Sequence, residues 1–302
     1  MSAWSPPRHP SGFYLSTGSE PTSIAIESDR INECMAYFEE HGLSRVSISR
    51  NYGFSGSDLD FLEGYPSIRG VAVSDASKID IGGLQFLEDS LERLLIGESR
   101  QSLSLDRFKN LEEFYGDWHS RLGISSECRR LRILSLSKYK PKSKDLSELA
   151  ELPALEDLSI IQSPLTSIRG VGRFCKLTRL ELSYLSKLES IAGIEELKGG
   201  CLEILDSQKC KKISDHAAVR TVPSLRVVKF NDCGEIPTID FLDELPNLED
   251  FRFVNTTVLD GDLHPLLRLK SAGFFKKKHY SHTPEQVDEI LVANAATSET
   301  RR

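Results

Sequence analysis

The sequence predicts an α/β solenoid, in which short strands form a curved parallel sheet and short helical or 3-10 segments return the chain behind it. Three observations predict this fold class. One apolar pattern recurs along most of the chain, leucines spaced by three residues precede several copies, and a helical pattern stands at each end. The end elements fit the prediction, because the first and last units of an open stack of repeats would otherwise expose the core.

The recurring pattern is apolar-x-x-apolar-x-apolar, and its copies begin 20 to 25 residues apart. Eleven copies start at Leu43, Ile68, Leu91, Leu111, Leu131, Leu155, Leu177, Leu202, Leu225, Leu248 and Leu269. The last two apolar positions of each copy belong to a short strand whose alternate side chains point into the core. One such unit cannot bury its apolar face alone, so we expect neighbouring units to stack as a parallel sheet with one continuous core.

Apolar residues between the strands recur every three residues. They are Leu146, Leu149, Leu152, Leu155 and Leu158 in one run, and Ile239, Leu242, Leu245, Leu248 and Phe251 in another. This spacing favours tight helical turns of the 3-10 type in the returning segments.

The pattern LxxLxLxxN/CxL resembles that of the leucine-rich repeat family from about Leu43 to Phe274. The short repeats are similar to those of internalins and of the leucine-rich regulator of protein phosphatase 1. The ninth residues of the first ten copies are Asn51, Ala76, Ser99, His119, Tyr139, Ser163, Leu185, Cys210, Cys233 and Thr256. Six of these ten are Asn, Cys, Ser or Thr, which the family uses to satisfy backbone groups where the chain leaves the strand. The resemblance therefore implies a structural role for Cys210 and Cys233, and a ladder interrupted at Ala76, Tyr139 and Leu185.

Two capping segments flank the repeats. At residues 23–42, Ile24 and Ile26 predict a strand, and an apolar stripe at Ile31, Cys34, Met35 and Phe38 predicts a helix that Gly42 can end. At residues 276–295, Thr283 to Gln286 predict an N-cap, a first-turn proline and a capping box, and Val287, Ile290 and Leu291 supply an apolar stripe. The repeats occupy residues 43–275. We expect the tails, residues 1–22 and 296–302, to be disordered.

Composition excludes several classes of function. The formal net charge of −7 disfavours a general electrostatic grip on nucleic acid or on an anionic membrane. No apolar run resembles a signal-peptide core or a membrane span, so we expect a soluble, cytoplasmic protein. The six cysteines form no CxxC pair, which favours reduced thiols over a zinc site or a disulfide framework.

No catalytic or cofactor motif stands out in the sequence. GxSxG, P-loop, GxGxxG and HExxH patterns do not occur, so no enzymatic activity, cofactor or small-molecule substrate is predicted. His279 and His282 have a spacing of three, and a loop before the last helix is a better interpretation than a metal site. The Lys276–Lys278 cluster is either solvated or in contact with an acidic partner.

The strand side chains that point away from the core form the candidate site. Between the last two apolar positions of successive units stand small or apolar residues, then Glu181 and Asp206, then Lys229 and Arg252. Opposite charges in this column either neutralise one another or meet a partner. Exposed aromatic residues beside charges are enriched in binding hot spots. The predicted partner-binding residues are Tyr115, Trp118, Tyr139, Arg179, Glu181, Tyr184, Asp206, Lys229 and Arg252.

The resemblance implies a non-enzymatic module that binds another protein on the concave face of the repeats, as an adaptor or as an immunity-type inhibitor. A second hypothesis is a substrate-recognition subunit of an enzyme, such as a ubiquitin-ligase component or effector. A third, recognition of nucleic acid or of a pattern ligand, lacks a basic face in the sequence.

Overall fold

The computed structural model describes residues 8–16, 22–197 and 199–299. The chain divides into two compact units, residues 1–134 and 135–302. No helix of the described residues is long and apolar enough to cross a membrane.

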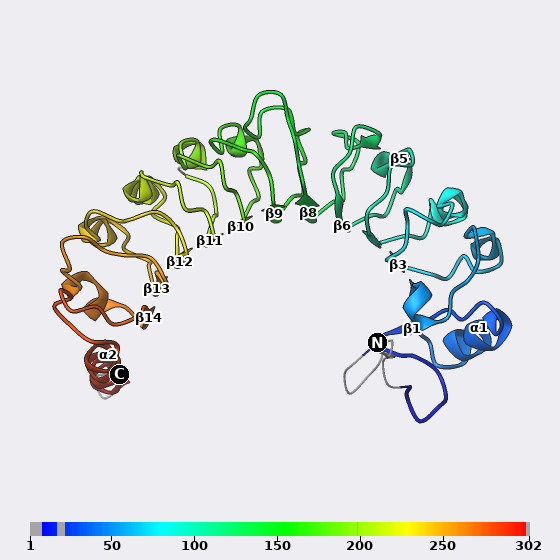
Figure 1. Ribbon diagram of the computed structural model, residues 1–302, viewed down its shortest axis with the longest axis horizontal. Coiled ribbons are helices and arrows are strands. Elements are labelled where there is room, and N and C mark those ends of the chain that lie inside the picture. Colours follow the sequence, from blue (N-terminus) through cyan, green and yellow to red (C-terminus); the bar gives the residue numbers. More distant parts are fainter. Residues whose placement is uncertain (1–7, 17–21, 198, 300–302) are drawn as a thin grey trace. The chain divides into compact units, whose positions relative to one another are not determined.

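Unit 1 is built on parallel strands that pair in chain order (Figure 1). They are β1 (Ser23–Ala25), β2 (Arg45–Ile48), β3 (Gly70–Val73), β4 (Arg93–Ile96) and β6 (Glu113–Asp117). A separate parallel pair joins β5 (Leu103–Ser104) to β7 (Leu122–Gly123). The 3-10 helices of this unit are Arg50–Tyr52, Asp60–Gly64, Gly82–Leu87 and Leu105–Arg107.

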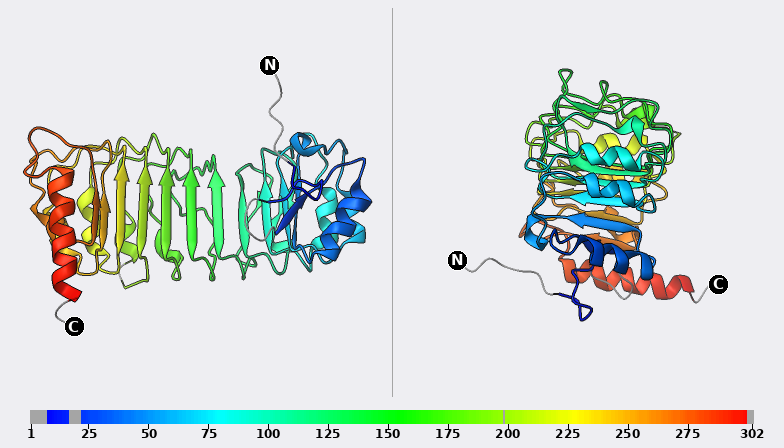
Figure 2. Two further views of the ribbon diagram at one scale, coloured as in Figure 1. Left: turned by 90° about the horizontal axis from the view of Figure 1, so that it is seen from below. Right: turned by 90° about the vertical axis from the view of Figure 1, so that its right-hand side faces the viewer.

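Unit 2 continues the same construction, and the boundary between the units falls within β8 (Ile133–Ser137). Its further strands are β9 (Asp157–Ile161), β10 (Arg179–Ser183), β11 (Ile204–Gln208), β12 (Val227–Asn231), β13 (Asp250–Arg252) and β14 (Ser271–Gly273). From β9 to β14 they run parallel, each paired with the next in the chain (Figure 2). Its 3-10 helices are Val171–Arg173, Ile194–Leu197, His216–Thr221, Asp240–Glu244 and His264–Arg268.

The strand pairing explains the apolar pattern. Every one of the eleven predicted copies contains a strand, and equivalent positions pair across neighbouring repeats: Leu180 lies opposite Leu158 and Leu205. All three of these leucines are fully buried. The predicted α/β repeat fold is therefore confirmed, because a parallel register of one repeat brings the apolar positions into one column.

The returning segments show both forms of tight turn. All ten apolar residues of the two spaced-by-three runs are buried. The second run contains the 3-10 helix Asp240–Glu244, whereas the first makes single turns, such as the hydrogen bond from Leu149 N to Leu146 O. Each segment thus packs its leucines behind the strands without a long helix.

Both predicted end helices are present. Helix α1 (Ile31–Glu40) buries Cys34, Met35 and Phe38. Helix α2 (Pro284–Glu299) packs against β14 and begins with a reciprocal capping box. Thr283 Oγ1 accepts a hydrogen bond from Gln286 N at 3.3 Å, and Gln286 Oε1 accepts one from Thr283 N at 2.9 Å.

The prediction of disordered tails is wrong for the described parts. Residues 8–16 pack on the first cap: Phe13 is buried against Tyr37, and Leu15 forms an antiparallel bridge with Ile24. The cause lies partly in Glu27, whose buried carboxylate takes an ion pair from Arg8. At the other end α2 continues to Glu299. The remaining tail residues, 1–7, 17–21 and 300–302, lie outside the described residues.

Candidate functional site

The strand register of unit 2 aligns the predicted charged column. Side chains at the fifth position of each repeat point away from the core, and parallel pairing places Glu181 beside Asp206, then Lys229, then Arg252. The third position of each repeat points to the same side and adds Arg179 beside the column. Five of the predicted partner-binding residues therefore share one face of one unit.

The charges on this face are paired with one another. Arg179 contacts three carboxylates, at 3.6 Å from Asp157, 3.5 Å from Glu181 and 3.9 Å from Asp206. Lys229 donates to Asp206 at 3.0 Å. Asp157 is half-buried, and this burial, reinforced by the charge of Glu181, raises the pKa of its carboxyl against the opposing effect of Arg179.

The pairing continues at the next strand. Arg252 pairs with Asp250 at 2.9 Å and donates to Ser271 Oγ at 3.2 Å. Four carboxylates (Asp157, Glu181, Asp206, Asp250) face three cations (Arg179, Lys229, Arg252), which leaves one excess negative charge. Of the two interpretations of the column, the structure therefore shows mutual neutralisation. The charged side chains of this face form an ordered lattice, that is, a network of ion pairs with almost no net charge.

Tyr184 directly follows β10 and is the exposed aromatic residue among those predicted to bind a partner in this unit. Its side chain is 45% exposed, and its backbone is left-handed with φ of +60°. The ammonium group of Lys209 lies 4.6 Å from the ring centroid and donates to the phenol oxygen at 3.2 Å. Sequence reasoning missed Lys209, although it occupies the same eighth position one repeat later.

The left-handed residue is a regular feature of unit 2. The eighth positions of six successive repeats all have positive φ: Lys138, Gln162, Tyr184, Lys209, Asp232 and Asn255. At this point the chain leaves the strand, and the N–H of the turning residue donates to the next repeat, as from Tyr184 N to Gln208 O at 2.8 Å. The turn holds the Tyr184 and Lys209 side chains beside each other at the rim of the strand face.

Tyr139, one of the predicted partner-binding residues, is buried and does not belong to the exposed face. Only 3% of its surface is exposed, because the ninth position turns under the end of the strand. Burial, aided by the charges of Glu148 and Asp145, raises the pKa of Tyr139 to about 12. Its carbonyl oxygen accepts a hydrogen bond from Ser163 Oγ at 2.5 Å.

The polar ninth positions of unit 2 form the ladder that the resemblance implies, and buried Tyr139 and Leu185 interrupt it as expected. Cys210 Sγ donates to Leu182 O at 3.3 Å, and Cys233 Sγ donates to Ser207 O at 3.5 Å. Thr256 Oγ1 donates to the carbonyl of Phe230 at 2.6 Å and accepts from Cys233 N at 2.9 Å. The buried cysteines thus satisfy backbone groups, and the described residues contain no cluster of metal-ligating side chains.

Tyr115 and Trp118 belong to unit 1, and both are partly buried. The guanidinium of Arg93 lies 4.8 Å from the Tyr115 ring centroid and pairs with Glu113 at 2.6 Å. The Tyr115 hydroxyl donates to the same Glu113 carboxylate at 3.0 Å. The predicted residues consequently divide between two units, and Tyr184 is the exposed aromatic residue among those that belong to the second.

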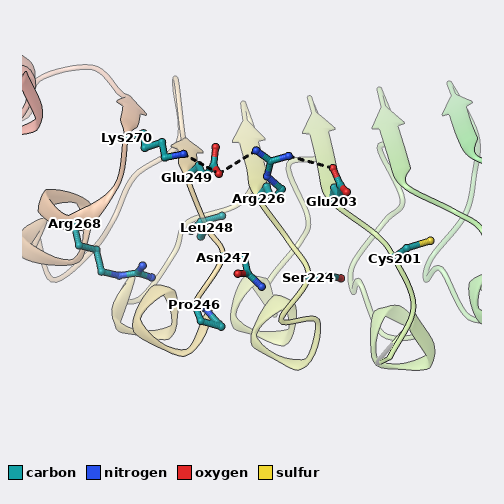
Figure 3. A pocket seen from close by; sticks show the side chains of 10 residues that line it. All are labelled: Cys201, Glu203, Ser224, Arg226, Pro246, Asn247, Leu248, Glu249, Arg268 and Lys270. Carbon is teal, nitrogen blue, oxygen red and sulfur yellow. Dashed lines mark hydrogen bonds and ion pairs between the residues drawn. The ribbon is translucent and has the colours of Figure 1, made fainter. Parts of the chain in front are cut away.

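A polar groove of about 620 Å³ runs along the other edge of unit 2, where the strands begin (Figure 3). Arg226 lies between Glu203 at 3.6 Å and Glu249 at 3.0 Å, and Lys270 completes the row at 3.0 Å from Glu249. The hydrogen bonds from Lys270 and Arg226 lower the pKa of Glu249. Below this row, Asn247 donates to Pro223 O at 2.9 Å. These contacts link neighbouring repeats, so the polar residues of the groove have a structural role in holding the repeats together.

The histidines singled out in the sequence also have structural contacts. His279 Nε2 lies 2.9 Å from Val258 O, and His282 Nδ1 lies 2.9 Å from Ser281 Oγ. Lys277, from the basic cluster, donates to the hydroxyl of Thr257. These bonds fasten the loop that leads into α2.

Comparison with known proteins finds no matching family model and no matching curated protein. Among solved structures, internalin InlF from Listeria monocytogenes is 16% identical, over 87% of this chain and 85% of its own, with a TM-score of 0.47. The leucine-rich repeat protein LIC12759 from Leptospira interrogans is 13% identical over 88% and 79% of the two chains, with a TM-score of 0.49. TLR13 in complex with ssRNA13 is 17% identical over 81% and 41%, with a TM-score of 0.38.

The fold assignment rests on the repeats of this chain. Their length falls within the roughly 20–29 residues of leucine-rich repeats. The strands pair one repeat apart, and a polar ladder follows them in unit 2. Each unit is therefore a solenoid with the leucine-rich repeat fold.

Proposed function

We propose that this chain is a non-enzymatic module that binds a partner protein through the concave strand face of its repeats. The observation that carries the proposal is Tyr184, a large aromatic side chain left 45% exposed on an otherwise ordered polar face. Aromatic side chains held in place lose little entropy on binding, and they dominate the energetics of many interfaces.

The charged lattice around Tyr184 supports the same function. Because Arg179, Glu181, Asp206 and Lys229 already hold one another, their side chains are fixed before a partner arrives. Preorganised polar groups give specificity, since a partner has to match their pattern, while adding little net affinity. Tyr184 would then supply most of the affinity, and the paired charges would determine which partner proteins fit.

The proposed setting is the cytoplasm, where the module would act as an adaptor or as an immunity-type inhibitor. All six cysteines are free thiols, and Cys175 and Cys201 are exposed. Thiols of this kind persist in a reducing compartment.

Site-specific photocrosslinking tests the proposed face. A photoreactive phenylalanine analogue replaces Tyr184 in one protein and Asp243, exposed in a 3-10 helix of the returning side, in a matched control. We expect irradiation in cells to give a discrete protein adduct from position 184 and none of that mass from position 243. Equal adducts from both positions, or none from position 184, would contradict a binding role for the strand face.

A further inference from the structure

A small hollow lies on the strand face of unit 1. Its volume is about 210 Å³, and it extends over β1 to β4. The floor is low because the outward residues there are small: Ser47 lies opposite Ala72, and Gly70 separates Arg45 from Arg93. Leu95, 36% exposed, forms an apolar wall beside Ala72. The hollow therefore combines an apolar side with two guanidinium groups.

The glycine on the floor positions Arg45. A Cβ atom at Gly70 would lie only 2.6 Å from Cγ of Arg45, so the arginine stem crosses β3 over the glycine and a side chain there would displace it. The side chain thus lies along the sheet, on the floor of the hollow.

The two arginines of the hollow differ in their partners. Arg93 is held by the Glu113 carboxylate at 2.6 Å and by the Tyr115 ring. Arg45 is partly buried, and within the described ranges its guanidinium has no hydrogen bond, ion pair or aromatic contact. A guanidinium without a partner favours a carboxylate that accepts two parallel hydrogen bonds.

We propose that this hollow receives one acidic side chain of a partner protein, whose carboxylate pairs with Arg45 while its methylene groups contact Leu95 and Ala72. The size supports this occupant, because small-molecule sites are larger, typically about 300–1,000 Å³. The inference rests on the proposed protein-binding function and adds to it a second contact, in unit 1, together with the chemistry of the group that is bound.

A pair of isosteric probes tests the hollow without the natural partner. N-acetylglutamate amide carries the carboxylate, and N-acetylglutamine amide replaces it with a neutral group of the same shape. Each is titrated into the full-length protein labelled with 15N-arginine, and the Arg45 Nε signal, assigned with R45K, is followed by NMR. We expect a saturable shift with the glutamate probe and at least about tenfold weaker binding of the glutamine probe.

Variants separate the hollow from nonspecific attraction to arginine. R45A should weaken binding of the glutamate probe by about tenfold or more, and A72L, which keeps Arg45 but fills the floor, should weaken it to a similar extent. R69A is the matched control, since Arg69 belongs to the same unit but pairs with Glu92 outside the hollow. It should bind within about twofold of the original protein. Circular dichroism confirms that each variant is folded.

The inference is overturned if the Arg45 signal does not saturate, if both probes move it equally, or if R69A loses as much binding as R45A. These results are independent of the crosslink at position 184. An adduct at position 184 with no response of the Arg45 signal would reject carboxylate binding in the hollow and leave the proposed function intact. A carboxylate-specific response of Arg45 with no adduct at position 184 would support the hollow as a binding site and reject the proposed binding role of the strand face of unit 2.

Discussion

The ammonium group of Lys209 stands over the ring of Tyr184, 4.6 Å from its centroid, although the two residues belong to consecutive repeats. Both backbones are left-handed at this point, so the contact arises from the repeat geometry rather than from a local loop. An exposed cation–π contact contributes only about 0.5–1 kcal/mol. Its main effect is to hold the Tyr184 ring in one orientation at the rim of the strand face.

Replacing Tyr184 by alanine should weaken binding of the crosslinked partner by about tenfold, because an exposed aromatic anchor is lost. The melting temperature should hardly change, since the ring is not in the core. Affinity is measured by isothermal titration calorimetry. L259A removes another exposed apolar side chain of unit 2, 50% exposed, and should bind normally. Equal losses for both variants would refute a specific role for Tyr184.

Replacing Thr256 by valine should destabilise the protein by about 2–4 kcal/mol. The substitution removes a buried hydroxyl, which leaves the carbonyl of Phe230 and the N–H of Cys233 without their partner. Urea denaturation measures the effect. T256S keeps the hydroxyl and loses only a methyl group, so its loss should be about 1 kcal/mol. If T256V were more stable than T256S, the hydrogen bonds of the Thr256 hydroxyl would not contribute to stability as expected.

Stability should fall as the pH is lowered from 7 to 5, with His216 as a main cause. This side chain is buried, both ring nitrogens lack hydrogen-bond partners among the described residues, and burial lowers its pKa to about 4 despite the opposing charge of Asp215. Between that pKa and the ordinary value of about 6.5, the unfolded chain binds a proton that the folded chain does not. The depressed pKa therefore destabilises the fold by about 2 kcal/mol at pH 5 relative to pH 7.

The variant H216L should remove this part of the pH dependence, as measured by urea denaturation at both pH values. His264 is exposed and paired with Asp262, so H264L serves as the matched control. This variant should keep the same dependence of stability on pH as the original protein. An unchanged pH slope in H216L would show that another group titrates.

Replacing Arg179 by glutamine should raise the pKa of Asp157 further, because the cation that opposes its burial is removed. The pKa is read from the 13C chemical shift of the Asp157 carboxyl carbon. Loss of stability should stay near 1 kcal/mol or less, since the Arg179 side chain is one-third exposed. R226Q changes a comparable arginine at the opposite edge of unit 2 and should leave Asp157 unaffected.

The periodic part of the structure was readable from the sequence because it depends on repeated local patterns. The strand positions followed from the leucine spacing, and the capping box at Thr283 followed from the identity of Gln286 three residues later. Both signals depend on short stretches of chain and need no knowledge of distant contacts.

The site was less predictable, because it depends on relations between repeats. Tyr139 looked like an exposed aromatic residue, yet its ninth position turns inward and buries it. The sequence placed Glu181 and Lys229 in one column, but whether they face a partner or their own neighbours depends on the registered strands. Lys209 and Arg45 drew no attention, since one gains its role from the ring beside it and the other from a glycine one strand away.

The left-handed turn at the eighth position of the unit 2 repeats separates two kinds of sequence change. Everything before the turn is held in register by the strands, whereas the differences in repeat length fall after it, in the returning segments. Added or deleted residues on the returning side therefore leave the order of the outward side chains intact. Such a molecule can acquire a new partner by substitutions on one side and change its length on the other, with neither process disturbing the other.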